Sequence, residues 1–456
     1  MNNRKISSPI KLCIVFVISF VLILIYSVDA KANASSTYES LSNSRIQYKK
    51  VLQLIKKKKG KIIYDIPEIY YVRFRIDKDK DKDKDKHNIL HHKTIEKKKT
   101  NIKIWRKNNY TPEYKFKKPK YWNKQWDIKA ITLKGKMYKH VLYSPSVTIG
   151  VVDSGIASNQ SSLNGTIIKK GSVNLVPKGG FNGKENDEYG NKGYIYDKIG
   201  HGTMIAGQIS GHGKVIGVYP KVGLHIYRVV GKKQSNPFWI MKGIISATNN
   251  KDSVINVSLG KYLYSSKSLK KNMEFKAWNR TIKYSKKHGS IIVASAGENG
   301  YDENNIHRFK KSFSKDNNIS VKKIKKLVDV PALLKNVISV GSLGPSGNES
   351  NFSNRSKNIS LFAPGGDTTE YFKYGSNYWN SHNLNSKKLI TVATIKNSYS
   401  YAYGTSLASA KVSALLAEYI AIQRRHHNYK NIKSRFLKYF KSYNKKVNGN
   451  IIIDNN

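Results

Sequence analysis

The sequence predicts an α/β fold in which helices cover both faces of a mostly parallel sheet. From about residue 121 to residue 425, short β-branched runs alternate with helical stretches, which is typical of βαβ crossovers. Glycine-flanked polar residues follow several of these runs. In such sheets the working residues collect at the carboxyl ends of the strands. At 456 residues the chain is long enough for one large core and an accessory domain.

The first 34 residues have the pattern of a secretory signal peptide. Basic residues precede the mostly apolar run 12–25, and Ala32-Asn33-Ala34 offers a small-residue cleavage site. The run is short for a membrane span, and an uncleaved anchor is the alternative. Cys13 is the only cysteine, so the mature chain can form no internal disulfide. These features favour a secreted, extracellular bacterial protein.

Residues 35–120 differ from the rest of the chain in their hydrophobic and charge patterns. Apolar residues between 41 and 55 predict an amphipathic helix that ends near Gly60. Alternating apolar and basic residues then predict a strand over 70–76. The run 77–86 alternates acid and base without an apolar residue, so we expect a solvated loop or linker there. The segment is interpreted as a small α+β module joined by a basic linker to the main domain, residues 121–456.

The main domain contains the alternating pattern in full. We expect strands over 147–152, 224–230, 254–259, 291–296, 337–343 and 359–362, with helices over 203–210, 238–249, 269–287 and after residue 406.

The charge is strongly basic, with a formal net charge of +53. Residues 121–456 carry 52 basic and 18 acidic side chains, so most of the excess belongs to the main domain. A lysine-rich solvated surface is the favoured interpretation. The alternative is attraction for an anionic partner, such as an acidic peptide, a cell wall or a membrane face. Nucleic acid is not expected, because no nucleic-acid-binding motif accompanies the charge.

Three residues at element ends are candidates for a hydrolytic site. Asp153 follows an apolar strand, His201 stands between two glycines at a helix start, and Ser406 follows Gly404 at the first turn of a long helix. Taken individually, Asp153 could be an ordinary turn residue, His201 a helix cap or surface group, and Ser406 a helix N-cap. Together they supply a nucleophile, a base and a carboxylate in the order Asp, His, Ser. This order favours a Ser-His-Asp site.

Four blocks of the sequence resemble the signature blocks of the subtilisin-like serine proteases. They are Ile149–Gly155, His201-Gly-Thr, Ser258-Leu-Gly and Gly404-Thr-Ser-Leu-Ala, and the likeness covers about 121–425. Within that family the lantibiotic leader peptidases are most similar. Gln125–Thr132 resembles the start of their mature domain, and Ser406-Leu-Ala with Lys411-Val-Ser resembles the segment around their catalytic serine.

The resemblance implies a role for each block. Ser406 would be the nucleophile, His201 the general base and then acid, and Asp153 the group that orients the imidazole. The substrate would lie as an extra strand along Ser258, Leu259 and Gly260, near Gly297 and Glu298. The segment 35–120 would be a propeptide that assists folding and blocks the cleft.

Two positions depart from the family. The family places the oxyanion-donating asparagine directly after Ala-Gly, where this sequence has Glu298, with Asn299 following. Three explanations are open: Asn299 donates through a one-residue shift, Glu298 is protonated, or the enzyme is slow. We favour the shift, because Gly297 and Gly300 permit unusual backbone angles. The second departure, Ala410 in place of proline, concerns helix geometry.

No cofactor is expected to be required. A structural calcium ion is common in the family, and one loop has oxygen donors without EF-hand spacing. A polar surface loop is the favoured interpretation, and we assign no metal ligands. The donors are Asn182, Asp187, Glu188 and Asp197.

The sequence therefore predicts a secreted serine endopeptidase that removes the acidic leader from an exported lantibiotic-type precursor. Two alternatives are open: a general degradative exoprotease, and a catalytically weak, subtilase-like binding protein. The propeptide is the expected second partner, as inhibitor and folding aid, and an anionic cell wall is the third. The precursor, the cleavage-site specificity and the processing site of the propeptide are not encoded in any motif of this sequence.

Overall fold

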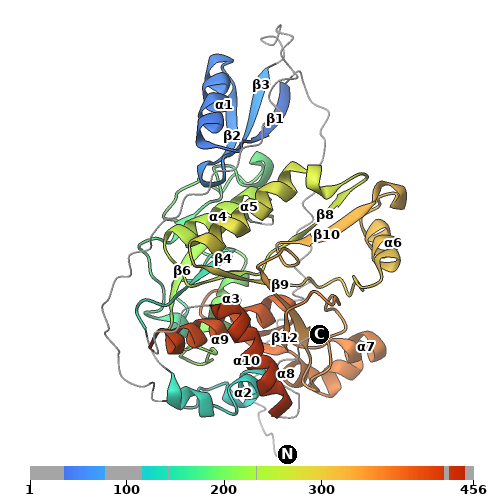
Figure 1. Ribbon diagram of the computed structural model, residues 1–456. Helices are drawn as coiled ribbons and strands as arrows, with labels where there is room; N and C mark the ends of the chain where they lie inside the picture. Colours follow the sequence, from blue (N-terminus) through green and yellow to red (C-terminus); the bar gives the residue numbers. More distant parts are fainter. Residues whose placement is uncertain are drawn as a thin grey trace, which may run out of the picture.

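Seven strands form a parallel sheet at the centre of the molecule (Figure 1). The computed structural model describes residues 35–77, 114, 116–141, 144–232, 234–425 and 431–446. The predicted signal peptide and the linker from 78 to 113 lie outside these residues. The spatial order is β12-β11-β9-β7-β4-β6-β5, and all neighbouring pairs are parallel. The strands are β4 (Thr148–Asp153), β5 (Val173–Asn174), β6 (Gly223–Arg228), β7 (Val254–Val257), β9 (Ile291–Ser295), β11 (Ile338–Leu343) and β12 (Leu361–Pro364).

Helices cover both faces of this sheet, which confirms the predicted fold class. α3 (His201–Ser210) and α9 (Thr405–Arg425) pack on one face, while α4 (Pro237–Asn249) and α5 (Met273–Lys287) pack on the other. The central strand β4 shows why. Ile149 and Val151 join the core that contains α3 and α9, whereas Val152 joins the core that contains α4 and α5. Successive side chains of a strand point to opposite faces, so an unbroken apolar run serves both layers.

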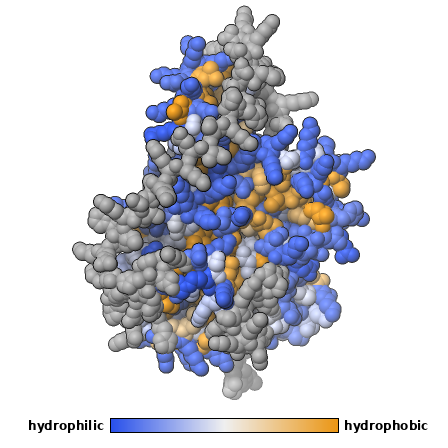
Figure 2. All heavy atoms as spheres, in the orientation of Figure 1, coloured by the Kyte–Doolittle hydropathy of each residue, from blue (hydrophilic) through white to orange (hydrophobic). Residues whose placement is uncertain are grey.

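The remaining elements surround this body. The helices are α2 (Trp126–Ile131), α6 (Ile306–Asp316), α7 (Thr369–Ser381), α8 (Leu384–Lys388) and α10 (Ile432–Lys446). Two antiparallel strand pairs complete the set: β8 (Lys261–Ser265) pairs with β10 (Lys326–Val330), and β13 (Ile390–Ala393) pairs with β14 (Tyr399–Ala402). Figure 2 shows hydrophobic side chains around β8 and β10, whereas hydrophilic ones cover most of the other visible surface. By length and composition α9 could cross a membrane, but 89% of its apolar window is buried, as expected of a core helix.

The described N-terminal residues form a small α+β module (Figure 1). Its elements are β1 (Ser35–Leu41), α1 (Arg45–Lys57), β2 (Lys61–Ile66) and β3 (Tyr71–Asp77). The strands form an antiparallel sheet in the order β1-β3-β2. The side chains of Tyr48 and Ile55 on α1 pack against Phe74 and Ile76 on one face of that sheet. The predicted helix and strand are both present, and each is shifted by a few residues.

The other face of the module packs on α4 and α5. Tyr64 and Tyr71 both stack on Phe238 of α4, with ring centroids 4.9 and 5.0 Å apart. Arg280 of α5 donates hydrogen bonds to the backbone carbonyls of Ser42 and Ile69. The module therefore contacts the main body through stacked aromatic rings and a half-buried guanidinium group.

Candidate active site

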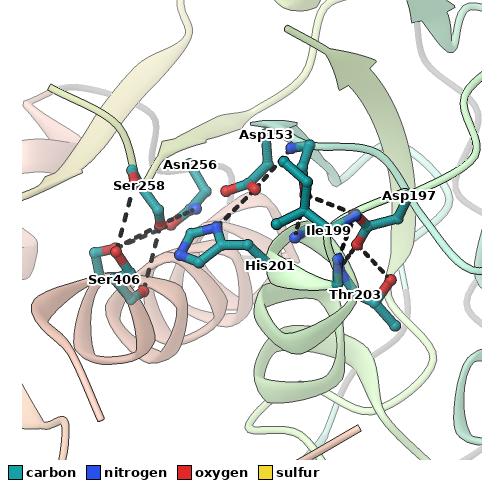
Figure 3. A network of polar contacts seen from close by, with 12 residues as sticks. Asp153, Asp197, Ile199, His201, Thr203, Asn256, Ser258 and Ser406 are labelled. Atoms are coloured by element: carbon teal, nitrogen blue, oxygen red, sulfur yellow. Dashed lines mark hydrogen bonds and ion pairs between the residues drawn. The ribbon is translucent and has the colours of Figure 1, made fainter. Parts of the chain in front are cut away.

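The first part of the site is a buried carboxylate beside a histidine (Figure 3). Asp153 ends β4 and is fully buried. Its Oδ1 lies 2.7 Å from Nδ1 of His201 and also accepts a 2.7 Å hydrogen bond from the backbone amide of Ser154. A carboxylate is an acceptor, so the imidazole keeps its proton on Nδ1 and leaves Nε2 free to act as a base.

A capping network holds His201 at the first position of α3 (Figure 3). Asp197 Oδ1 accepts from the amides of Ile199 and Gly200, and Asp197 Oδ2 accepts from the amide and hydroxyl of Thr203. The same carboxylate accepts from Ser154 Oγ at 2.8 Å, which links the end of β4 to the start of α3. Asp197 is therefore a positioning residue. The spacing Asp197 to Thr203 around His201 is the sequence signal that could have revealed it.

Ser406 is the third member and lies at the second position of α9, where its side chain is buried. The free ring nitrogen of His201 points toward it (Figure 3). Its hydroxyl donates to the carbonyl of Ser258 at 3.4 Å, and the Ser258 hydroxyl donates to the Ser406 carbonyl at 3.3 Å. The segment after β7, predicted to bind substrate, thus also fixes the start of α9. All three predicted catalytic residues meet at the carboxyl edge of the sheet.

Charge around the imidazole changes its protonation. Burial lowers the pKa of His201, but the adjacent Asp153 carboxylate opposes this effect, and Glu298 and Asp197 add to the opposition. The result is a pKa raised to about 9. The imidazolium is therefore favoured at neutral pH, and Nε2 becomes a free base above the raised pKa or when a nearby negative charge is neutralised.

The oxyanion region differs from the expected arrangement. Glu298, and not Asn299, faces the start of α9: its Oε1 accepts from the Ser406 amide at 3.5 Å and from Thr405 Oγ1 at 3.3 Å. Asn299 lies elsewhere, with its Oδ1 accepting from the Tyr262 hydroxyl at 3.2 Å. The physical reason is the turn at Gly297, whose φ of +89° directs the next side chain toward Ser406.

A comparison with known families decides the assignment. The Subtilase family model matches residues 144–437, a span that includes the three candidate catalytic residues Asp153, His201 and Ser406. The chain belongs to the subtilase family. It is accordingly a serine peptidase with the subtilisin-like fold that the sequence predicted.

This subtilase is similar to proteases that process lantibiotic leaders. The epidermin leader peptide-processing serine protease EpiP of Staphylococcus epidermidis is 35% identical over 421 residues, which are 88% of each chain. The nisin leader peptide-processing serine protease NisP of Lactococcus lactis subsp. lactis is 38% identical over 309 residues, 65% of this chain and 44% of NisP. The crystal structure of EpiP from Staphylococcus aureus has a TM-score of 0.74 at 29% identity and covers 88% of this chain and 91% of that one.

A buried acid, Asp329, and a half-buried one, Glu303, lie beside the predicted substrate-binding segments of this subtilase. A Cβ atom built on Gly260 would lie 3.3 Å from Asp329 Oδ1. Asp329 is on β10, directly opposite Tyr262 of β8. Burial raises the pKa of Asp329 to about 8, and burial together with Asp329 raises the pKa of Glu303 to about 9. Within the described part of the chain, no lysine or arginine forms an ion pair with either acid.

Asn354 connects these acids to the loop that carries Glu298. Its Nδ2 donates to the Ala296 carbonyl at 2.9 Å and to Glu303 Oε1 at 3.3 Å, and its Oδ1 accepts from the amide of Asn299. A Cβ atom built on Gly297 would lie 2.5 Å from this Nδ2. The acids, Asn354 and the two glycine-containing segments therefore border one region. Sequence reasoning missed Asp329, Glu303 and Asn354, because no local motif surrounds them.

Three of the four oxygen donors considered for calcium are already engaged. Asp187 and Glu188 each pair with Lys198 at 3.0 Å, and Glu188 also pairs with the buried Arg228. Asp197 caps α3 as described above. No group of three or more acidic, histidine or cysteine side chains suited to a metal ion occurs among the described residues. Asp187, Glu188 and Asp197 thus have protein partners, and the structural calcium ion stays a prediction.

Proposed function

We propose that this subtilase cuts the leader peptide from an exported, lantibiotic-type precursor, with Ser406 as nucleophile, His201 as general base and Asp153 as its orienting group. The observation that carries the proposal is similarity along nearly the whole chain. The EpiP match spans 88% of both chains, so it extends beyond the catalytic blocks that all subtilases share. Similarity limited to those blocks would support only general proteolysis.

Asp329 and Glu303 support cleavage after a basic residue. They border the segments around Gly260 and Gly297, where the residue before the cut bond would bind. A lysine or arginine side chain entering this region would meet two carboxylates without basic partners. Its charge would favour their ionised forms and offset the cost of burying them.

The N-terminal module supports a propeptide. We propose that residues 35–120 assist folding and then inhibit the enzyme until they are removed. The stacking of Tyr64 and Tyr71 on Phe238 gives the module an apolar contact with the body. We further propose that the protein is secreted, which the signal-like residues 1–34 favour, and that its positive charge attracts anionic cell wall. A structural calcium ion stays a prediction, with no ligands assigned.

The decisive test uses purified full-length protein and synthetic precursor peptides. We expect one cut at the leader junction, found by mass spectrometry, and none with Ser406→Ala. Rapid digestion of casein into many fragments would instead identify a general degradative protease. A third outcome, no cleavage and no labelling of Ser406 by a fluorophosphonate, would identify a binding protein.

A further inference from the structure

The position of Glu298 conflicts with the chemistry of acyl transfer. In the tetrahedral intermediate of a serine protease, the backbone amide of the nucleophilic serine donates to the oxyanion. Here that amide faces Oε1 of Glu298 at 3.5 Å. The carboxyl group also packs against Gly404, where an added Cβ atom would lie only 2.4 Å from Oε1. Glu298 therefore borders the position that the oxyanion must occupy.

An ionised carboxylate in this position would oppose catalysis. Two negative oxygens separated by a few ångströms in a water-poor site repel each other strongly. A neutral carboxylic acid has the opposite effect, because its O–H group donates a hydrogen bond. The catalytic value of Glu298 thus depends on one proton.

The surroundings of Glu298 favour that proton. Burial raises the pKa of Glu298, while the His201 charge and the hydrogen bonds from Ser406 and Thr405 act in the opposite direction; the balance is a raised pKa. The other titratable group facing it is Tyr403, whose pKa is raised by burial and by Glu298. Among the described residues, no lysine or arginine forms an ion pair with this carboxyl.

We propose that Glu298 is a catalytic residue that donates to the oxyanion as a neutral carboxylic acid. The proposal requires Glu298 and His201 to share a single proton. When it is on His201, the base is blocked and the carboxylate is negative. When it is on Glu298, the base is free and the oxyanion donor is formed. Both requirements of catalysis are therefore met by the same protonation state of the pair.

The acylation step then balances without any further group. The carbonyl oxygen of the substrate accepts a hydrogen bond from the Ser406 amide. The terminal torsion of Glu298 rotates easily and turns the carboxyl O–H toward the same oxygen. Ser406 Oγ bonds to the carbonyl carbon as its proton moves to His201 Nε2, and the π pair becomes the oxyanion lone pair. When the intermediate collapses, the C–N bond breaks and His201 returns the proton to the leaving amine. Glu298 donates a hydrogen bond throughout and keeps its proton.

The test compares two substitutions of similar size, Glu298→Gln and Glu298→Met. The first retains a neutral donor and the second removes it. We expect Glu298→Gln to remain within about tenfold of the wild-type kcat/KM near pH 6. Glu298→Met should lose about 10²–10³, the usual cost of removing one oxyanion donor. The wild-type profile should fall at alkaline pH as Glu298 loses its proton, and this fall should be absent in Glu298→Gln.

Glu349→Gln is the matched control. Glu349 is another glutamate with a raised pKa, but it is exposed and its charged neighbours are Arg355 and Asp302. Its variant should keep the wild-type pH profile. Rates are referred to the folded fraction measured by circular dichroism. Glu298→Asn replaces the Gln variant, and Glu298→Leu replaces the Met variant, if either does not fold. The Asn variant should behave as the Gln variant does.

Three results would overturn the proposal: equal losses in the Gln and Met variants, faster turnover in the Met variant than in the wild type, or an alkaline fall that persists in the Gln variant. The inference rests on the peptidase activity and not on the leader specificity. We therefore repeat each comparison with the rate at which a fluorophosphonate labels Ser406, which requires no leader. If the precursors are not cleaved but the variants show the expected fluorophosphonate labelling rates, only the proposed leader specificity is wrong.

Discussion

A histidine beside an aspartate is not by itself a catalytic feature of this protein. His225 and Asp252 form a second pair, with Nδ1 and Oδ1 2.6 Å apart. Asp252 also accepts from the hydroxyls of Thr148 and Tyr227, and it lies at the amino ends of the strands. The pair at the carboxyl ends has Ser406 beside the free nitrogen of its histidine (Figure 3). Position in the sheet, and not hydrogen-bond length, separates the catalytic pair from the structural one.

This contrast gives a prediction for Asp153→Asn. The amide can donate to Nδ1 and thereby stabilise the wrong tautomer of His201, so we expect kcat to fall about 10⁴-fold. Peptide hydrolysis measured under saturating substrate checks it. Asp252→Asn is the matched control: it should lower the melting temperature and leave kcat of the folded protein within a few fold. A similar loss of kcat in both variants would contradict the assignment.

Asp329 provides a second prediction at the residue scale. We expect Asp329→Asn to lower kcat/KM by about 30-fold or more for peptides with arginine before the cut bond, because a buried charge pair is lost. Peptides with leucine at that position should be hydrolysed at nearly the wild-type rate. Assays on the two matched peptides measure the change. An equal loss for both would show that Asp329 supports the fold and not the specificity.

Among the elements, α2 and α9 are joined by a buried ion pair. Lys411 Nζ lies 2.9 Å from Asp127 Oδ2, and both side chains are fully buried. These residues belong to the two stretches whose sequence resembles the leader peptidases. The ion pair therefore connects the entry to the body with the helix that carries Ser406.

We predict that Lys411→Met lowers the free energy of unfolding by about 3–5 kcal/mol, since it leaves a buried carboxylate unpaired. The double variant Lys411→Met with Asp127→Leu should recover most of the loss, because no buried charge is left. Urea unfolding of the two variants and the wild type measures both effects. Equal stability of the single and double variants would show that the loss comes from altered packing alone.

The elements that the sequence predicted best are those built from unbroken apolar runs. β4, β9 and β11 lie within a residue or two of their predicted ranges, because a strand buried on both faces is apolar throughout. β1 and β2 were not predicted: β1 is mostly polar and β2 is a short run without clear alternation, and both are held by pairing with β3. Such pairing depends on residues distant in sequence.

The site was predicted unevenly for a related reason. Asp153, His201 and Ser406 each end or begin an element, so the topology alone brings them to one edge. The direction of Glu298 was missed because it depends on the backbone angle at Gly297. Asp329 was missed because it reaches the site through the β8–β10 ribbon, whose pairing no local pattern reveals.

For the molecule as a whole, buried acids set the pH dependence of stability. Burial raises the pKa of Glu418 on α9 to about 8, and Asp329, Glu303 and His201 also have raised pKa values. A group whose pKa is higher in the folded state binds protons on folding, so its contribution is complete at low pH and is lost as the pH rises through the folded value. All four groups therefore act in the same direction.

We expect the melting temperature to fall from about pH 5 to pH 9. Glu418→Gln should raise the free energy of unfolding by about 1–3 kcal/mol at pH 8 and have little effect at pH 4.5, because the variant no longer titrates. Calorimetry over this range checks the slope. A benefit of the same size at both pH values would mean that the gain is not electrostatic.

The excess of basic side chains in residues 121–456, 52 against 18 acidic ones, bears on encounter with substrate. If the leader is acidic, kcat/KM for the precursor should decline several-fold between about 0.05 and 0.5 M NaCl, since salt screens attraction between distant charges. A short neutral peptide with the same cut site should show little change. Equal salt dependence of both substrates would contradict a role for the surface charge.

The order of the catalytic residues along the chain has a consequence in time. The nucleophile is 205 residues beyond the base, near the start of a helix that lies against the central strands. A polypeptide that emerges from its amino end holds Asp153 and His201 long before it holds Ser406. Such a nascent protease cannot digest its neighbours or itself. Hydrolytic competence then comes late in folding, because the nucleophile arrives together with α9, a helix that fills much of the core.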